Sequence, residues 1–208
     1  MKKILLSIYI IAGLLFCYSV FTENIVLRTS TKAIPLLVLI FAIKPNNNYN
    51  KYIFAGFVFS LFGDILLMHA LGYFIWGLVA FLIAHLLYIK AFTKHNSDLK
   101  LLNSLPFYAF AGALSIFFAP YLKEMLIPVV VYMFVVATMV WRAFVQKNTT
   151  KISQFAFWGA VFFAFSDTNI AVAKFYYNYD YSDIVIIVSY WIAQYLIFLS
   201  VKNNKIPV

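Results

Sequence analysis

Two aspartates, Asp64 and Asp167, stand inside long apolar stretches of the chain. A charged side chain near the centre of a bilayer costs about 2.5–3.5 kcal/mol on insertion scales, so each one requires a reason. The two residues fall at matching depths in predicted helices that run in the same direction. Two close carboxylates resist ionising together, and a pair with one neutral member supplies both a general acid and a general base. The pattern therefore predicts acid–base catalysis by a carboxylate pair.

Other polar side chains are predicted to reach the same layer. Since polar groups at bilayer depth must face protein or water, we expect them to surround a polar cavity together with the two aspartates. These residues are Lys32, His85, Tyr190 and Gln194.

One further residue is a candidate for support or substrate binding. Arg142 ends an apolar stretch, where it is predicted to extend to the inner interface or to hold a lipid phosphate.

Structural roles would explain some of these residues equally well. Asp64 could pair with Lys32 and hold two neighbouring helices in register. A membrane histidine or glutamine such as His85 or Gln194 often only joins helices, through hydrogen bonds worth about 0.6 kcal/mol each. The two aspartates at one depth are harder to explain in this way.

The elements that must position these groups are transmembrane helices. Of the 208 residues, 64% are hydrophobic and 11% are charged, which is far from the composition of a soluble domain. A helix of about 20 apolar residues spans a bilayer, so the chain is predicted to be an all-α polytopic bundle of about eight spans, in a single membrane domain over residues 1–208. The predicted spans are 4–21, 30–43, 52–70, 73–92, 104–120, 124–145, 154–173 and 184–201.

The basic residues predict the orientation of the bundle. With eight spans, twelve of the 16 lysines and arginines fall on the side of both termini and four on the other side. Cytoplasmic loops carry this excess, so both termini are predicted to be cytoplasmic, in the inner or plasma membrane of the cell. The same distribution explains the net charge of +9 without a nucleic-acid partner, because the charges sit between apolar runs and not on one face.

A faint internal repeat relates the two halves of the chain. Ile34-Pro35 resembles Ile127-Pro128, Phe62-Gly63-Asp64 resembles Phe165-Ser166-Asp167, and Ile83-Ala84-His85 resembles Ile192-Ala193-Gln194. The matches recur in order, each four spans later, as in a parallel 4+4 repeat. Apolar sequence also produces such matches by chance, so the duplication is a hypothesis.

The chain offers few ligands for a metal. Its single cysteine, Cys17, excludes an intramolecular disulfide and a cysteine cluster, and three scattered histidines do not form a convincing zinc site. We expect neither a metal nor another cofactor.

Several segments around these polar residues resemble the YhhN family of membrane proteins, the lysoplasmalogenases. The resemblance covers nearly the whole chain from the second span onward, and its most specific parts contain Asp64, His85 and Asp167. The matching segments are 31–37, 59–68, 77–88, 140–143, 159–168 and 190–197.

This resemblance implies an enzyme that hydrolyses the vinyl ether bond of a lysophospholipid, releasing a fatty aldehyde and glycerophosphoethanolamine or glycerophosphocholine. It also implies that Asp64 and Asp167 are the catalytic residues and that Ser166, which directly precedes Asp167, is a supporting residue of the site. Two other functions suit intramembrane acids, a histidine and a repeat: a proton-coupled transporter of a lipid or small solute, and a non-catalytic lipid-binding protein.

Overall fold

The computed structural model describes residues 3–68 and 73–201. The last residues of the predicted span 52–70, and three lysines of the charge count (Lys2, Lys202 and Lys205), lie outside this part of the chain. The described residues are helical: α1 (Lys3–Phe21), α2 (Ile25–Lys32), α3 (Ile34–Ala42), α4 (Asn48–Leu66), α5 (Phe74–His95), the 3₁₀ turn η2 (Leu101–Ser104), α6 (Leu105–Leu122), the 3₁₀ turn η3 (Lys123–Met125), α7 (Leu126–Gln146), α8 (Ser153–Ala171), the π-helical turn η4 (Val172–Tyr176) and α9 (Ser182–Leu199).

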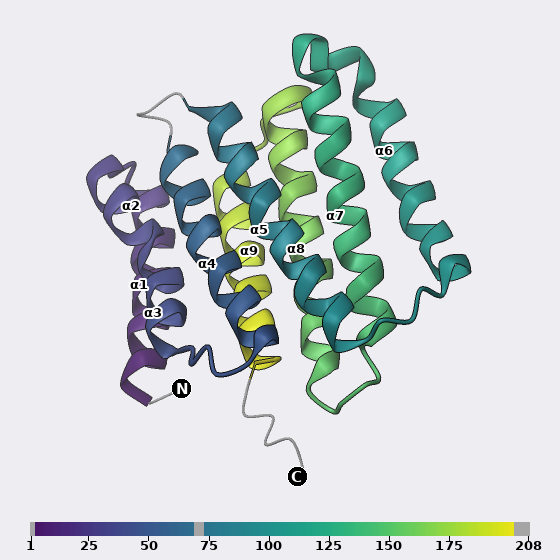
Figure 1. The fold of residues 1–208 in the computed structure, drawn as a ribbon. Helices are drawn as coiled ribbons and strands as arrows, with labels where there is room; N and C mark the ends of the chain where they lie inside the picture. The colour runs from purple at the N-terminus through teal and green to yellow at the C-terminus, as the bar shows by residue number, and fades with distance from the viewer. Residues whose placement is uncertain (1–2, 69–72, 202–208) are drawn as a thin grey trace.

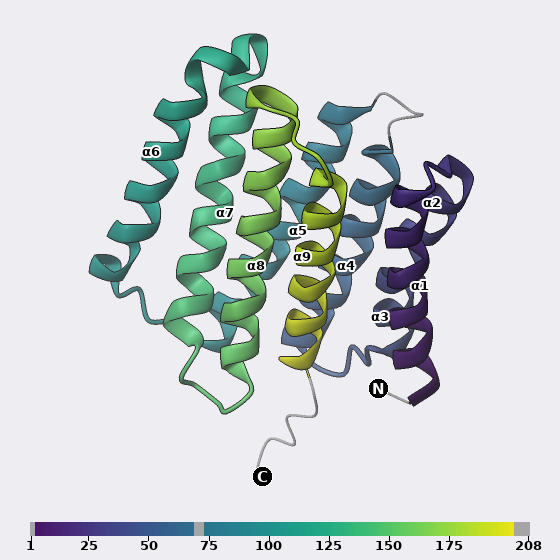
Figure 2. The same ribbon diagram turned by 180° about the vertical axis from the view of Figure 1, so that it is seen from behind.

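The helices form one bundle in which successive passes alternate in direction (Figure 1). With α2 and α3 counted as one pass, the described chain makes eight passes, and α1 begins at the end of the bundle where α9 finishes. α1–α3 and α6 lie at opposite edges, as Figure 2 also shows from behind. The predicted all-α membrane bundle is therefore confirmed.

Six stretches of the described residues are long and apolar enough to cross a membrane. One of them, Leu101–Gln146, contains both α6 and α7. α4 is not among the six because it begins with polar residues that include Asn48, Asn50 and Lys51, although it runs through the bundle alongside α5.

The second pass differs from the prediction. The span 30–43 was predicted as one short helix, whereas the structure has a longer pass, Ile25–Ala42, that breaks at Ala33. It begins at Ile25 because the Asn24 side chain accepts a hydrogen bond from the Leu27 N–H and caps the helix. The polar residues that follow are satisfied within the helix, since Thr29 and Ser30 each donate to the carbonyl four residues earlier. The break precedes Pro35, which has no N–H to continue the helical hydrogen bonds.

The third pass also begins earlier than the predicted span 52–70. α4 starts at Asn48, where the Asn47 side chain accepts a hydrogen bond from the Asn50 N–H and caps the helix. The prediction followed the apolar run alone and therefore missed a polar first turn.

Two helix pairs pack in equivalent ways. α4 packs along α5 at Gly56, where an added Cβ would lie 2.2 Å from the Tyr88 ring. α8 packs along α9 at Gly159, where a Cβ would lie 2.7 Å from Ile197. Gly56 precedes Asp64 by as many residues as Gly159 precedes Asp167. This matched packing supports the duplication hypothesis and places each aspartate the same number of residues beyond the close contact of its helix pair.

Candidate active site

Asp167 lies in α8 and faces α5 and α7. Its side chain is 11% exposed, and its Oδ2 accepts a hydrogen bond of 2.8 Å from the hydroxyl of Tyr132 in α7. The Nε2 atom of His85, in α5, lies 3.7 Å from the same oxygen, which is too long for a hydrogen bond. Three helices therefore bring a carboxyl, a phenol and an imidazole together.

Sequence reasoning missed Tyr132. Tyrosines in apolar helices are often packing or interfacial residues, and Tyr132 was not distinguished from the others. Its position well inside a predicted span was the available signal, because a phenol hydroxyl at that depth needs a partner.

His85 is fully buried against aromatic rings. The centroid of its ring lies 4.5 Å from that of Phe163 and 5.3 Å from that of Tyr132. Neither ring nitrogen has a hydrogen-bond partner among the described residues. His85 therefore has unused hydrogen-bonding capacity beside Asp167. Leaving a buried polar group unsatisfied costs about 1–3 kcal/mol, so a water or ligand that bonds to the ring would be stabilised there.

Asp64 belongs to a second cluster, formed between α4 and α9. It is 3% exposed, and its Oδ2 accepts a 2.8 Å hydrogen bond from the Tyr190 hydroxyl. No ion pair within 4 Å joins it to Lys32 among the described residues. Gln194 lies in α9 one turn beyond Tyr190 and accepts a 2.9 Å hydrogen bond from Tyr88.

Aromatic rings connect the two clusters. The ring centroid of Phe163 lies 4.5 Å from that of His85, beside Asp167, and 5.3 Å from that of Tyr190, beside Asp64. Phe81 packs edge-on against both Phe163 and Tyr190. Asp167 thus accepts a hydrogen bond from α7, and Asp64 accepts one from α9. The residues predicted to surround one cavity therefore fall into two groups, and phenylalanine rings pack against both groups.

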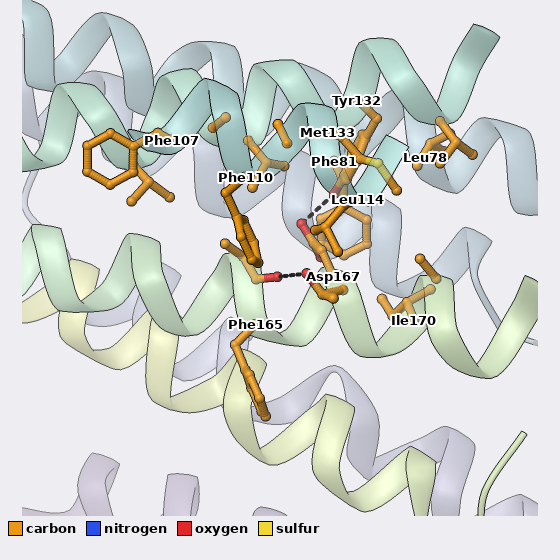
Figure 3. Close-up of a pocket in the computed structure, with 18 of the residues that line it drawn as sticks. Leu78, Phe81, Phe107, Phe110, Leu114, Tyr132, Met133, Phe165, Asp167 and Ile170 are labelled. Carbon is orange, nitrogen blue, oxygen red and sulfur yellow. Dashed lines mark hydrogen bonds between the residues drawn. The ribbon is translucent and has the colours of Figure 1, made fainter. Parts of the chain in front are cut away.

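An apolar cavity of about 410 Å³ lies beside the Asp167 cluster. It is bounded mainly by α5, α6, α7 and α8, and Figure 3 shows Phe110 and Leu114 of α6 across the cavity from Asp167. Asp167 and Tyr132 both line it. The other five residues predicted to ring a polar cavity do not: Lys32, Asp64, His85, Tyr190 and Gln194. The prediction of one polar cavity was therefore wrong for this space, because α6 supplies an apolar wall.

Arg142 and Ser166 make structural hydrogen bonds. The Arg142 guanidinium donates to the Thr93 hydroxyl at 3.0 Å and to the backbone carbonyls of Asn96 and Asp98, which ties the segment after α5 to α7. Ser166 donates to the Ile186 carbonyl at 2.8 Å and joins α8 to α9. Neither residue lines the cavity. In the part of the chain that the structure describes, no group of three or more histidine, cysteine or acidic side chains could hold a metal ion.

Comparison with known proteins places this arrangement in a family. The chain matches the YhhN family over residues 27–201. It is similar to lysoplasmalogenase TMEM86B of Mus musculus, at 32% identity over 175 residues that cover 81% of this chain and 71% of the relative. It is also similar to lysoplasmalogenase TMEM86A of Homo sapiens, at 34% identity over 165 residues that cover 75% of this chain and 67% of the relative. No solved structure matches. Because the family match extends over most of the sequence, this chain belongs to the YhhN family.

Proposed function

We propose that this protein is a lysoplasmalogenase that hydrolyses the vinyl ether bond of a lysophospholipid within the membrane. The observation that carries the proposal is Asp167, a carboxyl in the wall of an apolar cavity inside a membrane bundle. The cavity volume of about 410 Å³ is in the range of small-ligand sites, and its lining suits an alkenyl chain. The names of the relatives point to the same substrate class.

The reaction needs an acid more than a nucleophile. A vinyl ether reacts when the alkene carbon remote from the oxygen is protonated, since the alkene electron pair forms the new C–H bond and leaves an oxocarbenium ion. Asp167 donates this proton as a carboxylic acid, and general acid catalysis contributes about 10²–10⁴-fold. The carboxylate that remains then stabilises the adjacent cation.

Water completes the reaction and restores the enzyme. Water adds to the oxocarbenium carbon and gives up a proton to the Asp167 carboxylate, forming a hemiacetal. When the hemiacetal collapses, its hydroxyl proton moves to the ether oxygen, and the C–O bond breaks to give an aldehyde and the glycerol hydroxyl. One carboxyl thus serves as acid and then as base, as glycosidases use one residue in both roles for a related cation.

The neighbouring residues divide into two roles in this proposal. Tyr132 holds the Asp167 carboxyl by its hydrogen bond, and His85 orients that carboxyl or the attacking water. Asp64, together with Tyr190, Lys32 and Gln194, acts through the aromatic rings packed between the clusters. The proposal thereby keeps both aspartates in the site but places only Asp167 against the substrate.

Aldehyde release tests the activity directly. Purified protein in detergent should release one aldehyde per molecule of lysoplasmalogen hydrolysed. The matched control is the lysophospholipid with a saturated ether in place of the vinyl ether, which has no alkene to protonate and should release nothing. Absence of aldehyde, together with substrate-dependent proton flux in vesicles, would instead identify a proton-coupled transporter.

The bundle is proposed to lie with both termini in the cytoplasm. The twelve-to-four distribution of basic residues supports this orientation. A reporter fused after Val208 should be active in the cytoplasm. A signal from the opposite side of the membrane would overturn either the orientation or the even number of spans.

A further inference from the structure

The cavity extends past the C-terminal end of α8 and reaches the surroundings of Lys174. After Ala171, α8 continues into the π-helical turn η4, and the cavity lining continues with it to Phe175. Phe74, at the start of α5, also lines this end, and its ring packs edge-on against Phe175 at 5.9 Å. Two aromatic rings therefore form the end of the cavity that lies opposite the side of the termini.

Lys174 stands at this aromatic end. Its Nζ lies 4.6 Å from the centroid of the Phe74 ring, and the residue is exposed. The described residues include no acidic group within 4 Å of it. Its ammonium group is thus held beside a cavity wall with its hydrogen-bonding capacity free for a ligand. π-helical turns of this kind are frequent at functional sites.

The distance to Asp167 suits a lysophospholipid. Lys174 follows Asp167 by seven positions, which corresponds to about 10 Å along the helix axis, a gap that the long lysine side chain can reduce. In the substrate, only the three glycerol carbons and one oxygen separate the vinyl ether oxygen from the phosphorus. An ammonium group binds phosphate through charge-assisted hydrogen bonds, and lysine commonly does so.

We propose that Lys174 binds the phosphate of the lysophospholipid headgroup at the mouth of the cavity and so places the vinyl ether against Asp167. The inference rests on the proposed function for its substrate. It also sets the direction of access: the headgroup lies at the end of the bundle opposite the termini, and the chain extends inward along α6.

Binding of lipids that cannot be hydrolysed tests this proposal apart from catalysis. The two probes are a saturated-ether lysophosphocholine and the corresponding alkylglycerol without phosphate, each titrated into detergent-purified protein. Lys174→Met keeps the aliphatic stem over Phe74 and removes the charge, so we expect about tenfold weaker binding of the phosphate-bearing lipid only. Lys174→Arg should restore most of the affinity.

Lys123 provides the matched control. It is an exposed lysine at the same end of the bundle, in the turn between α6 and α7. Unlike Lys174, it has no cation–π contact with a cavity-lining ring among the described residues. Lys123→Met should leave the binding of both lipids unchanged. An equal loss of affinity in Lys174→Met and Lys123→Met would mean that only general surface charge matters. An equal loss of affinity for both lipids in Lys174→Met would mean that Lys174 only packs against the cavity wall. Either result overturns the proposal.

Turnover supplies the second readout. With lysoplasmalogen, Lys174→Met should raise KM by about tenfold and leave kcat largely unchanged, because the phosphate is bound equally in the ground state and the transition state. A wild-type protein that binds the phosphate lipid through Lys174 but releases no aldehyde would refute the proposed hydrolysis and leave this site standing. An unchanged KM in an active enzyme would refute the site alone.

Discussion

The two aspartate regions share a sequence pattern and differ in what surrounds them. Asp64 is sealed between α4 and α9, where it accepts a hydrogen bond from Tyr190. Asp167 accepts a hydrogen bond from Tyr132 and also lines a cavity. A repeated motif thus supplies two carboxyls, and of the two only Asp167 lines the apolar cavity that the described residues form.

The neighbouring helices account for this difference. Counted from the prolines Pro35 and Pro128, Tyr132 in the second half corresponds to Leu39 in the first half. Leu39 is fully buried and has no hydroxyl to donate to a carboxylate. α6 lies at the edge of the bundle (Figure 1). The cavity lies between α6 and α8, and α5 and α7 also line it (Figure 3). The repeated motif thus places a carboxyl in each half of the chain. The differences between the halves, at Tyr132 and in α6, give only Asp167 a position in the cavity wall.

The largest effect should come from Asp167→Asn. Asparagine keeps the size of the side chain and accepts the Tyr132 hydrogen bond, but it cannot donate and recover a proton in the same way. We expect aldehyde release to fall by at least about 10²–10⁴-fold with the thermal unfolding temperature in detergent little changed. Near-normal turnover would reverse the assignment of the two regions.

His85→Ala should have the next largest effect, about 10- to 100-fold in turnover, since the imidazole positions the Asp167 carboxyl or water rather than supplying the proton. His85→Gln, which retains a hydrogen-bonding group of similar reach, should recover part of the loss. Turnover of both variants is compared with wild type after thermal melting verifies their folding. A loss in His85→Ala as large as that in Asp167→Asn would make His85 the proton donor.

Asp64→Asn should cost less, about tenfold in turnover, because Asp64 does not line the cavity and acts through packed rings. Asparagine can still accept the Tyr190 hydrogen bond, so the thermal unfolding temperature should change little, as in Asp167→Asn. The measurement is turnover and melting side by side with Asp167→Asn. Equal losses in the two asparagine variants would place both carboxyls at the reaction, as the sequence pattern first indicated.

The smallest losses in kcat should come from replacing the two tyrosines that donate hydrogen bonds to the aspartates. Tyr132→Phe removes the hydrogen bond to Asp167 while keeping the ring, so we expect a loss of about tenfold or less in kcat, consistent with one hydrogen bond worth about 1 kcal/mol. Tyr190→Phe is the matched control, because it removes the equivalent bond from Asp64. It should change kcat less than Tyr132→Phe does. The opposite order would show that the buried Asp64 cluster, and not the cavity cluster, controls the chemistry.

The sequence alone determined the class of the fold and the residues at its centre. Apolar runs predicted the helices because a chain in lipid must satisfy its backbone hydrogen bonds internally, which leaves the helix as the simplest spanning element. The boundaries failed where asparagines cap helix starts, as at Asn24 and Asn47, and where hydroxyls bond within α2, since hydropathy does not register those hydrogen bonds. Asp64, His85 and Asp167 stood out because polar groups at bilayer depth are costly.

Only the tertiary structure decided which of these residues share a site. Depth along a helix follows from counting residues, but the direction in which a side chain points depends on how each helix is rotated and packed against its neighbours. That packing joined Tyr132 and His85 to Asp167, sent Asp64 to Tyr190, and engaged Arg142 with the segment after α5. Nor could sequence predict the cavity, because its volume depends on how far α6 stands from α8, and that distance is set by side chains from four helices at once.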